Sequence, residues 1–167
     1  GGVQGLITYM RTDSLRISDD AQSAAREFIV EKYGEEYAPK TARKFKAAKS
    51  AQDAHEAIRP AKVEITPASV KKALTTDQYK LYKLIWERFL ASQMAPAEYD
   101  TVSVSLENSG HTFRANGSTL VFRGYTALYV EGTDVKEEKE KALPALTKET
   151  KVTLEEIEKN QHFTQPP

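Results

Sequence analysis

The sequence of 167 residues contains no cysteine, which excludes disulfide bridges, thiolate metal sites and cysteine nucleophiles. No apolar run approaches the roughly 20 residues that a membrane-spanning helix needs, so we expect no membrane partner. The opening residues lack the basic leader and apolar core of a secretory signal. These absences are compatible with the reducing cytoplasm, and an opening Gly-Gly in place of Met leads us to expect a fragment.

The sequence also lacks an excess of either charge, with 24 Lys and Arg against 24 Asp and Glu. A protein that binds nucleic acid on its own usually carries a basic excess, because it neutralises phosphates. The charge is unevenly distributed, however, since residues 40–59 are basic and residues 131–141 are acidic. The basic residues of the first segment are Lys40, Arg43, Lys44, Lys46, Lys49 and Arg59. Such a local patch is compatible with a nucleic-acid surface in a neutral chain.

The pattern of apolar residues before Pro96 is helical. Ser18 is a good N-cap and Gly34 a plausible stop, which together predict a first helix. A second start signal stands at Thr66-Pro67, where a cap residue precedes proline at the first helical position. Thr76 is then predicted to cap an amphipathic helix. The apolar positions of that helix are Tyr79, Tyr82, Leu84, Ile85, Trp86, Phe89, Leu90 and Met94.

Beyond Pro96 the pattern is typical of antiparallel strands. Residues 101–106 alternate between polar and apolar side chains, as a half-buried strand does. Three further segments are also predicted to be strands, namely residues 111–115, 118–123 and 151–157. Turn residues at 108–110 and at Asn116-Gly117 predict tight connections. The predicted fold class is therefore α+β, a helical region followed by an antiparallel β region.

The segment ITYMRTDS, residues 7–14, places a tyrosine shortly before a polar stretch that contains one arginine, Arg11. A phenol with a pKa of ~10 is a poor nucleophile at neutral pH, but a guanidinium favours the phenolate and binds phosphate. In an extended segment, side chains two residues apart lie on the same side. Tyr9 and Arg11 would then suit attack on a phosphate. A packed tyrosine beside a solvated arginine accounts for the same spacing.

The segment DAHEAIRP is predicted to form a short helix, capped by Ser50 or Asp53. On a helix, His55 and Arg59 share a face. One of them titrates near neutral pH and the other is a permanent cation, so the pair suits a phosphate backbone. Glu56, three residues before Arg59, is placed to hold the guanidinium. An ordinary ion pair on a surface helix explains these residues equally well.

Together, ITYMRTDS and AHEAIRP resemble, in this order, the active-site tyrosine motif and the downstream histidine motif of bacterial type IA DNA topoisomerases. Residues 80–100 and the segment QHFTQPP at residues 161–167 also resemble this family in order and spacing. In the family the last motif leads into an Arg-Tyr/Phe-Thr/Ser-Glu-Ala segment, which is missing here. The resemblance covers essentially the whole chain.

The resemblance implies that the parent protein relaxes negative supercoils by passing one DNA strand through a transient break in another, without ATP. Tyr9 is then the nucleophile, which becomes linked to the 5′ side of the break. Arg11 is implied to orient the scissile phosphate or to stabilise the transition state, and His55 to contact DNA or relay protons. Further DNA-binding candidates are Arg59, Thr12 and Asp13, and Asp13 is expected to order Arg11.

By the same resemblance, residues 1–65 are the helical tyrosine-bearing part of the gate domain. Residues 66–97 are amphipathic helices that link to the arch, and residues 98–167 are the antiparallel β region of the arch. Family members bind Mg²⁺ through a glutamate and an Asp-x-Asp motif of another domain, and no Asp-x-Asp occurs here. We therefore expect no metal ligands in this chain and no activity from it alone.

The partners that the resemblance implies are single-stranded DNA and the missing metal-binding and DNA-binding domains of the parent protein, at the nucleoid in a bacterial cytoplasm. Two other functions fit the same residues. One is a DNA-binding or gate-forming module without chemistry of its own, and the other is a structural domain in which Tyr9 is a core residue. Salt-dependent DNA binding distinguishes these two, because phosphate contacts weaken steeply as salt rises.

Overall fold

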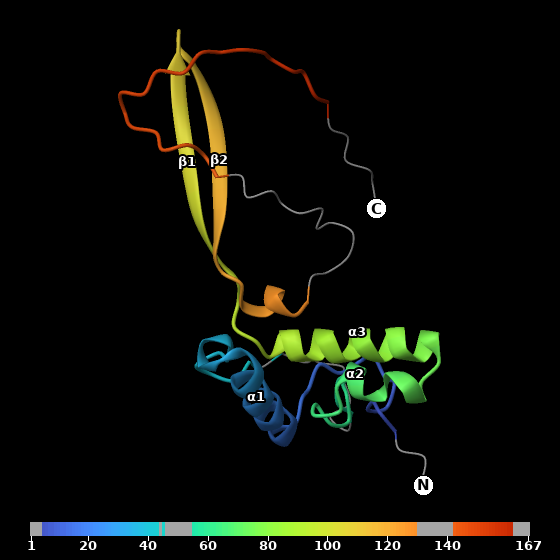
Figure 1. Cartoon of the computed structure of the whole chain (residues 1–167). Coiled ribbons are helices and arrows are strands. Elements are labelled where there is room, and N and C mark those ends of the chain that lie inside the picture. The colour runs from blue at the N-terminus through green and yellow to red at the C-terminus, as the bar shows by residue number, and fades with distance from the viewer. Residues whose placement is uncertain (1–4, 44, 46–54, 130–141, 162–167) are drawn as a thin grey trace.

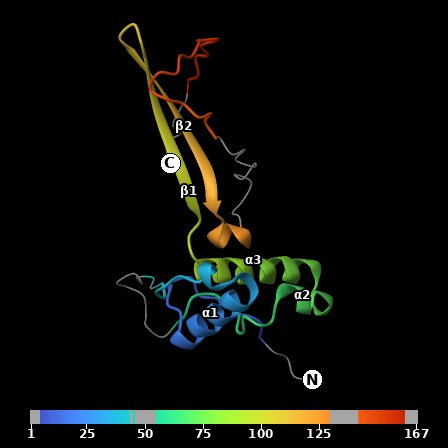
Figure 2. The same cartoon turned by 60° about the vertical axis from the view of Figure 1, so that its left-hand side comes forward.

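The computed structural model describes residues 5–43, 45, 55–129 and 142–161. The helices come first: α1 (Asp19–Tyr33), α2 (Pro67–Val70) and α3 (Thr76–Ser92), with 3₁₀ turns η1 (Glu35–Tyr37) and η2 (Lys71–Ala73). They are followed by strands β1 (Glu98–Asn108) and β2 (His111–Phe122) and by the 3₁₀ turn η3 (Gly124–Ala127). The two strands form a hairpin that projects away from the packed helices (Figures 1 and 2). The predicted α+β class, with its division near Pro96, is confirmed.

The first two helices begin where the sequence predicts. Ser18 caps α1, because its hydroxyl accepts a hydrogen bond from the backbone N–H of Ala21 at 3.4 Å. The helix ends at Gly34, whose φ of 110° lies in the region that favours glycine. Thr66 caps α2 by accepting from the backbone N–H of Ser69 at 3.3 Å. Within the described part of the chain, no helix is both long and apolar enough to span a membrane.

The longest helix, α3, is capped by Thr75 and not by Thr76. The hydroxyl of Thr75 accepts from the backbone N–H of Gln78 at 3.3 Å, and the Gln78 side chain accepts from the N–H of Thr75 at 3.0 Å. This reciprocal capping box decides the start, because the residue three places after Thr76 is Tyr79, which has no amide to return the bond. The predicted apolar face is largely buried, but Leu84 is 44% exposed.

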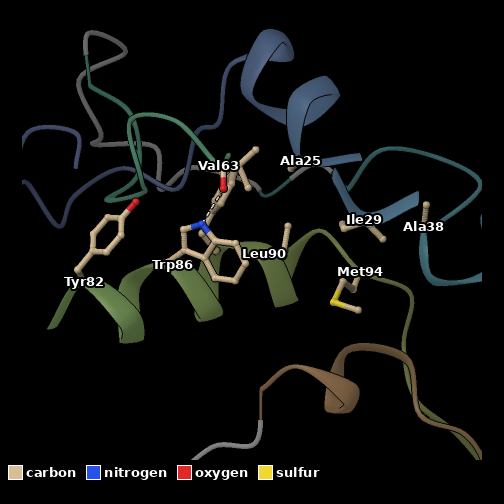
Figure 3. Close-up of a cluster of buried hydrophobic side chains, with 9 residues drawn as sticks. Ala25, Ile29, Ala38, Val63, Tyr82, Trp86, Leu90 and Met94 are labelled. Atoms are coloured by element: carbon tan, nitrogen blue, oxygen red, sulfur yellow. Dashed lines mark hydrogen bonds between the residues drawn. The ribbon is translucent and has the colours of Figure 1, made fainter. Parts of the chain in front are cut away.

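The hydrophobic core lies where α1 and the chain around Val63 pack against α3 (Figure 3). Trp86 stands near its centre, and its indole N–H donates to the carbonyl of Val63 at 2.8 Å. The Trp86 ring also packs edge-on against Phe28 of α1, with 5.5 Å between the ring centroids. One turn earlier, Tyr82 donates to the carbonyl of Ile65 at 2.6 Å, and burial raises the pKa of this hydroxyl. The other buried members are Ala25, Ile29, Ala38, Phe89, Leu90 and Met94.

Strands β1 and β2 form an antiparallel hairpin. Its register runs from Glu98 opposite Phe122 to Asn108 opposite His111. The connection consists of Ser109 and Gly110, with φ values of 50° and 79°. These left-handed conformations give the chain the tight reversal that joins twisted strands. The turn predicted at residues 108–110 is therefore confirmed.

Two predictions about strands are wrong. Asn116-Gly117 makes no turn but continues β2, and Asn116 lies opposite Ser103 and accepts a hydrogen bond from its hydroxyl at 2.8 Å. Pairing along the whole of β1 outweighs the local preference of Asn-Gly for a turn. Residues 151–157 form no strand, and no backbone hydrogen bond within the described residues involves them. Alternating polar and apolar residues give a segment one polar and one apolar face, but a strand also needs a neighbouring strand for its backbone hydrogen bonds.

A short joint fixes the base of the hairpin to the helical region. The backbone N–H of Ala95 donates to the carbonyl of Tyr37 at 2.7 Å, and the carbonyl of Ala95 accepts from the N–H of Tyr125 at 2.9 Å. The ring of Tyr37 also lies 4.8 Å from the ring of Phe122, between centroids. Backbone bonds and ring packing thus both hold the hairpin in place.

Gly124→Ala tests how tightly this joint is packed. Gly124 is buried at φ 48°, and a Cβ there would lie 2.3 Å from the carbonyl oxygen of Pro96. The left-handed conformation alone costs roughly 1–2 kcal/mol with a side chain, and the Pro96 backbone would also have to move. We expect chemical denaturation to show a greater loss of stability than for Gly110→Ala, where φ is 79° and no atom lies within 4 Å of the added Cβ. Equal losses would show that the close approach is not maintained.

Candidate active site

Two segments that are far apart in the sequence pair beside Tyr9. Ile7 and Pro60 form an antiparallel bridge. The two flanking backbone bonds run from the Thr8 N–H to the Arg59 carbonyl at 2.9 Å and from the Ala61 N–H to the Leu6 carbonyl at 2.8 Å. This pattern makes Ile7 and Pro60 a pair without mutual hydrogen bonds, so the missing N–H of proline breaks no ladder bond. The pairing brings the chain before Tyr9 against the chain after His55.

The short helix predicted over DAHEAIRP is wrong for the described residues 55–60, which are not helical. Both peptide groups of Ala57 bind partners far along the chain. Its N–H donates to the carbonyl of Arg16 at 2.8 Å, and its carbonyl accepts from the hydroxyl of Thr8 at 2.9 Å. These bonds replace the local ones that a helix would make, so His55 and Arg59 do not share a helical face.

Tyr9 and His55 lie together, although the sequence separates them widely. Tyr9 is 74% exposed, and its ring centroid is 5.8 Å from that of His55, with the ring planes tilted by 37°. Nδ1 of His55 is buried and has no hydrogen-bond partner among the described residues. A buried polar atom without a partner is unfavourable unless another group binds it. The site therefore combines an accessible phenol with an imidazole that has unused hydrogen-bonding capacity.

The chain bends immediately after Tyr9. The backbone N–H of Arg11 donates to the carbonyl of Tyr9 at 2.9 Å, which closes a three-residue turn. The extended geometry used to predict that Tyr9 and Arg11 share a side is therefore wrong. Instead, Nε of Arg11 binds the Asp13 carboxylate at 2.7 Å, and these side chains are 42% and 33% exposed. Asp13 orders Arg11 in a solvent-accessible pair, and exposed pairs of this kind contribute at most about 1 kcal/mol. The guanidinium can thus exchange the carboxylate for a phosphate, and Thr12 between the two is exposed.

Arg59 is held more firmly than Arg11. Its Nε and one terminal nitrogen bind the same Glu56 oxygen at 2.9 and 2.6 Å, and the other terminal nitrogen donates to the carbonyl of Pro60 at 3.0 Å. The prediction that Glu56 holds the Arg59 guanidinium is confirmed. Because these side chains are only 14% and 22% exposed, the pair is shielded from solvent. A phosphate would have to compete with Glu56 for Arg59.

Sequence reasoning missed Thr8, whose hydroxyl joins the two segments of the site. The sequence signal that could have identified Thr8 is its position, because it is a hydroxyl residue between Ile7 and Tyr9. Several residues of the predicted basic patch and helix cap lie outside the described residues, namely Lys44, Lys46, Lys49, Ser50 and Asp53.

The described residues do not fit a magnesium site. No group of three or more His, Asp or Glu side chains among them lies close enough to hold a metal ion. Asp13 and Glu56 are each bound to a guanidinium, Arg11 and Arg59 respectively. Mg²⁺ prefers carboxylate, phosphate and water oxygens in an octahedral arrangement. The site does present an exposed phenol beside an imidazole, with the guanidinium of Arg11 two residues along the chain, and these residue types suit nucleophilic attack on phosphorus.

Known proteins are similar to this chain over most of its length. A family model described as DNA topoisomerase matches residues 3–167. The full-length topoisomerase I of Thermotoga maritima is similar to this chain in structure, with a TM-score of 0.68 and 40% sequence identity. The similarity covers 85% of this chain and 21% of that protein. The chain thus spans about a fifth of the length of the relative it matches.

Proposed function

Because the chain belongs to the DNA topoisomerase family, as part of a bacterial type IA enzyme, we propose that Tyr9 is the nucleophile with which the parent enzyme cleaves DNA. The enzyme cleaves and rejoins one strand and thereby relaxes negative supercoils without ATP. The observation that carries this proposal is the exposed phenol of Tyr9 beside the partly buried ring of His55. By contrast, Tyr82, a tyrosine of the hydrophobic core, is 4% exposed.

The reaction exchanges one phosphate ester for another. The Tyr9 oxygen attacks a backbone phosphorus of single-stranded DNA, and the bond from that phosphorus to the 3′ oxygen breaks. The phenol loses its proton and the departing 3′ oxygen gains one, which leaves a 5′-phosphotyrosine and a free 3′ hydroxyl. Rejoining reverses these steps. Because the ester conserves the energy of the broken bond, no nucleotide hydrolysis is needed.

The neighbouring side chains have supporting roles in this proposal. Arg11 leaves its exposed pair with Asp13 and stabilises the charge on the phosphate oxygens in the transition state. His55 contacts the DNA next to Tyr9 or passes protons, a role that its unpartnered Nδ1 supports. Further contacts to the strand come from Arg59, Thr12 and Asp13.

The remaining parts of the active enzyme lie in other domains of the parent protein. By its resemblance to the family, the parent protein would hold Mg²⁺ through ligands of the metal-binding domain, and this chain alone would be inactive. Residues 1–65 would form part of the gate domain, residues 66–97 the link, and residues 98–167 part of the arch. The partners are single-stranded DNA and the metal-binding and DNA-binding domains, in the bacterial cytoplasm at the nucleoid.

Mapping the covalent adduct tests this function directly. The full-length parent protein is incubated with Mg²⁺ and single-stranded oligonucleotides labelled at either end, and is then denatured. A 3′ label should stay with the protein and a 5′ label should be released, because the protein holds the 5′ phosphate of the break. Digestion and mass spectrometry should find the nucleotide on Tyr9. Attachment to another residue, or the opposite polarity, would contradict the proposal.

His55→Ala in the full-length protein is expected to weaken DNA binding and to slow relaxation while the fold persists. The loss of a proton-transferring group typically costs roughly 10²–10⁴-fold in rate. Plasmid relaxation measured from pH 6 to pH 9, with DNA affinity from fluorescence anisotropy, checks this result. His111→Ala, at the first residue of β2, is the control. Wild-type activity of His55→Ala across this pH range would exclude a role for the ring.

A further inference from the structure

We propose that Thr8 is a positioning residue, whose hydroxyl sets the register between the segment carrying Tyr9 and the segment carrying His55. The inference rests on the proposed function of Tyr9. Thr8 would not touch the DNA or the reacting atoms. It would act by fixing the position of the backbone that carries Tyr9.

Thr8 bonds to the opposite segment through both its backbone and its side chain. Its N–H donates to the carbonyl of Arg59 at 2.9 Å. Its hydroxyl donates to the carbonyl of Ala57 at 2.9 Å and accepts from the N–H of Arg59 at 3.0 Å. In a regular antiparallel ladder, the Arg59 N–H would bond to the backbone carbonyl of Thr8. The hydroxyl takes the place of that carbonyl, so the backbone leaves the ladder at the residue before Tyr9.

The same bonds close the base of the loop that carries the proposed catalytic groups. The carbonyl of Ala57 accepts a hydrogen bond from the Thr8 hydroxyl, and the N–H of Ala57 donates to the carbonyl of Arg16. The two ends of the loop of residues 9–15, which carries Tyr9 and Arg11, are therefore bonded to the same residue, Ala57. Because Ala57 lies two residues after His55, the loop and the imidazole share a single anchor.

Tyr9 needs such an anchor because its own side chain supplies little restraint. The side chain is 74% exposed, and within the described part of the chain its hydroxyl makes no hydrogen bond. Its position therefore comes from the backbone on either side. A displacement of about 1 Å at a reacting group can cost roughly 10²-fold in rate. Loss of the Thr8 hydroxyl would leave the Ala57 carbonyl and the Arg59 N–H without this partner and would let the segments shift.

Thr8→Val and Thr8→Ser separate the hydroxyl from the shape of the side chain. Valine keeps the shape and removes the hydroxyl, whereas serine keeps the hydroxyl and removes the methyl group. In the full-length protein with Mg²⁺ and a labelled single-stranded oligonucleotide, we expect Thr8→Val to slow adduct formation at saturating DNA by roughly 10- to 100-fold. DNA affinity should be unchanged, and Thr8→Ser should restore most of the rate. Thr126→Val is the control, because it removes a hydroxyl that donates to the carbonyl of Arg123 at 2.6 Å, in η3.

The outcomes are distinguishable. A wild-type rate for Thr8→Val would overturn the inference, and so would a Thr8→Ser rate as low as that of Thr8→Val, since packing would then explain the loss. If thermal melting shows Thr8→Val to be unfolded, Thr8→Ala is measured at a temperature at which it is folded, with the same expected loss. Tyr9→Phe is run in parallel. An adduct formed by Tyr9→Phe would refute the proposed nucleophile, whereas its absence together with a wild-type rate for Thr8→Val would refute only the role of Thr8.

Discussion

Tyr9→Phe is expected to abolish DNA cleavage by the full-length parent protein while its fold and its DNA affinity persist. The substitution removes one oxygen from a ring that is 74% exposed, so little packing is lost. Removing a nucleophile costs far more than removing a supporting contact, and we expect adduct formation to fall by roughly 10⁴-fold or more. Adduct formation with a labelled oligonucleotide, plasmid relaxation and DNA affinity are the measurements.

The matched control for this substitution is Tyr99→Phe. Tyr99 lies in β1 of the hairpin and is also exposed, at 49%. Its replacement should leave cleavage at the wild-type rate. Cleavage that survives in Tyr9→Phe would mean that another group attacks the phosphate. A loss of DNA affinity to the same extent as cleavage would instead make Tyr9 a binding residue.

Trp86→Ala is expected to lower the free energy of unfolding by ~3–5 kcal/mol, the range for truncating a large buried aromatic side chain. Trp86 is 5% exposed and joins three parts of the helical region. It belongs to α3, packs against Phe28 of α1 and donates to the carbonyl of Val63 at 2.8 Å. Its removal leaves a cavity and an unbonded carbonyl. Urea denaturation of this chain, followed by far-ultraviolet circular dichroism, measures the loss.

Two further substitutions on the same helix calibrate this result. Trp86→Phe keeps most of the buried ring but loses the bond to Val63, so its cost should be intermediate. Leu84→Ala, at a position that is 44% exposed, should cost well below the Trp86→Ala value. A loss below about 1 kcal/mol for Trp86→Ala would contradict its place in the core, because surface substitutions are usually within about 0.5 kcal/mol. Val63 lies three residues after Pro60, so Trp86→Ala should also loosen the segment that faces Tyr9.

Local signals in the sequence predict most of the helical region and the turn of the hairpin. Ser18, Gly34 and Thr66 work as helix ends because each acts within a few residues of its own position. The start of α3 was misplaced by one residue, since two threonines compete and only Thr75 has a glutamine at the reciprocating position. The error is small because the two candidate caps are adjacent in the sequence.

Where a segment's partners are distant, local rules fail. Asn116-Gly117 has the composition of a turn but is held in β2 by pairing with β1. The alternating residues 151–157 have no neighbouring strand to pair with among the described residues. Ala57 forms hydrogen bonds with Thr8 and Arg16 in place of the bonds that a helix would make. In each case, hydrogen bonds made or missing between remote segments decide the conformation.

The candidate site was also predictable from the sequence only in part. The resemblance of ITYMRTDS and AHEAIRP to motifs of the family singles out Tyr9, Arg11 and His55, because motifs are recognised from the order of residues and need no geometry. The pairing of Arg59 with Glu56 also followed from their spacing. Only the folded chain shows that Tyr9 meets His55, that the backbone turns before Arg11, and that Thr8 ties the two segments together. Those contacts join residues far apart in the sequence, and they exist because the antiparallel pairing of Ile7 with Pro60 brings the two segments side by side.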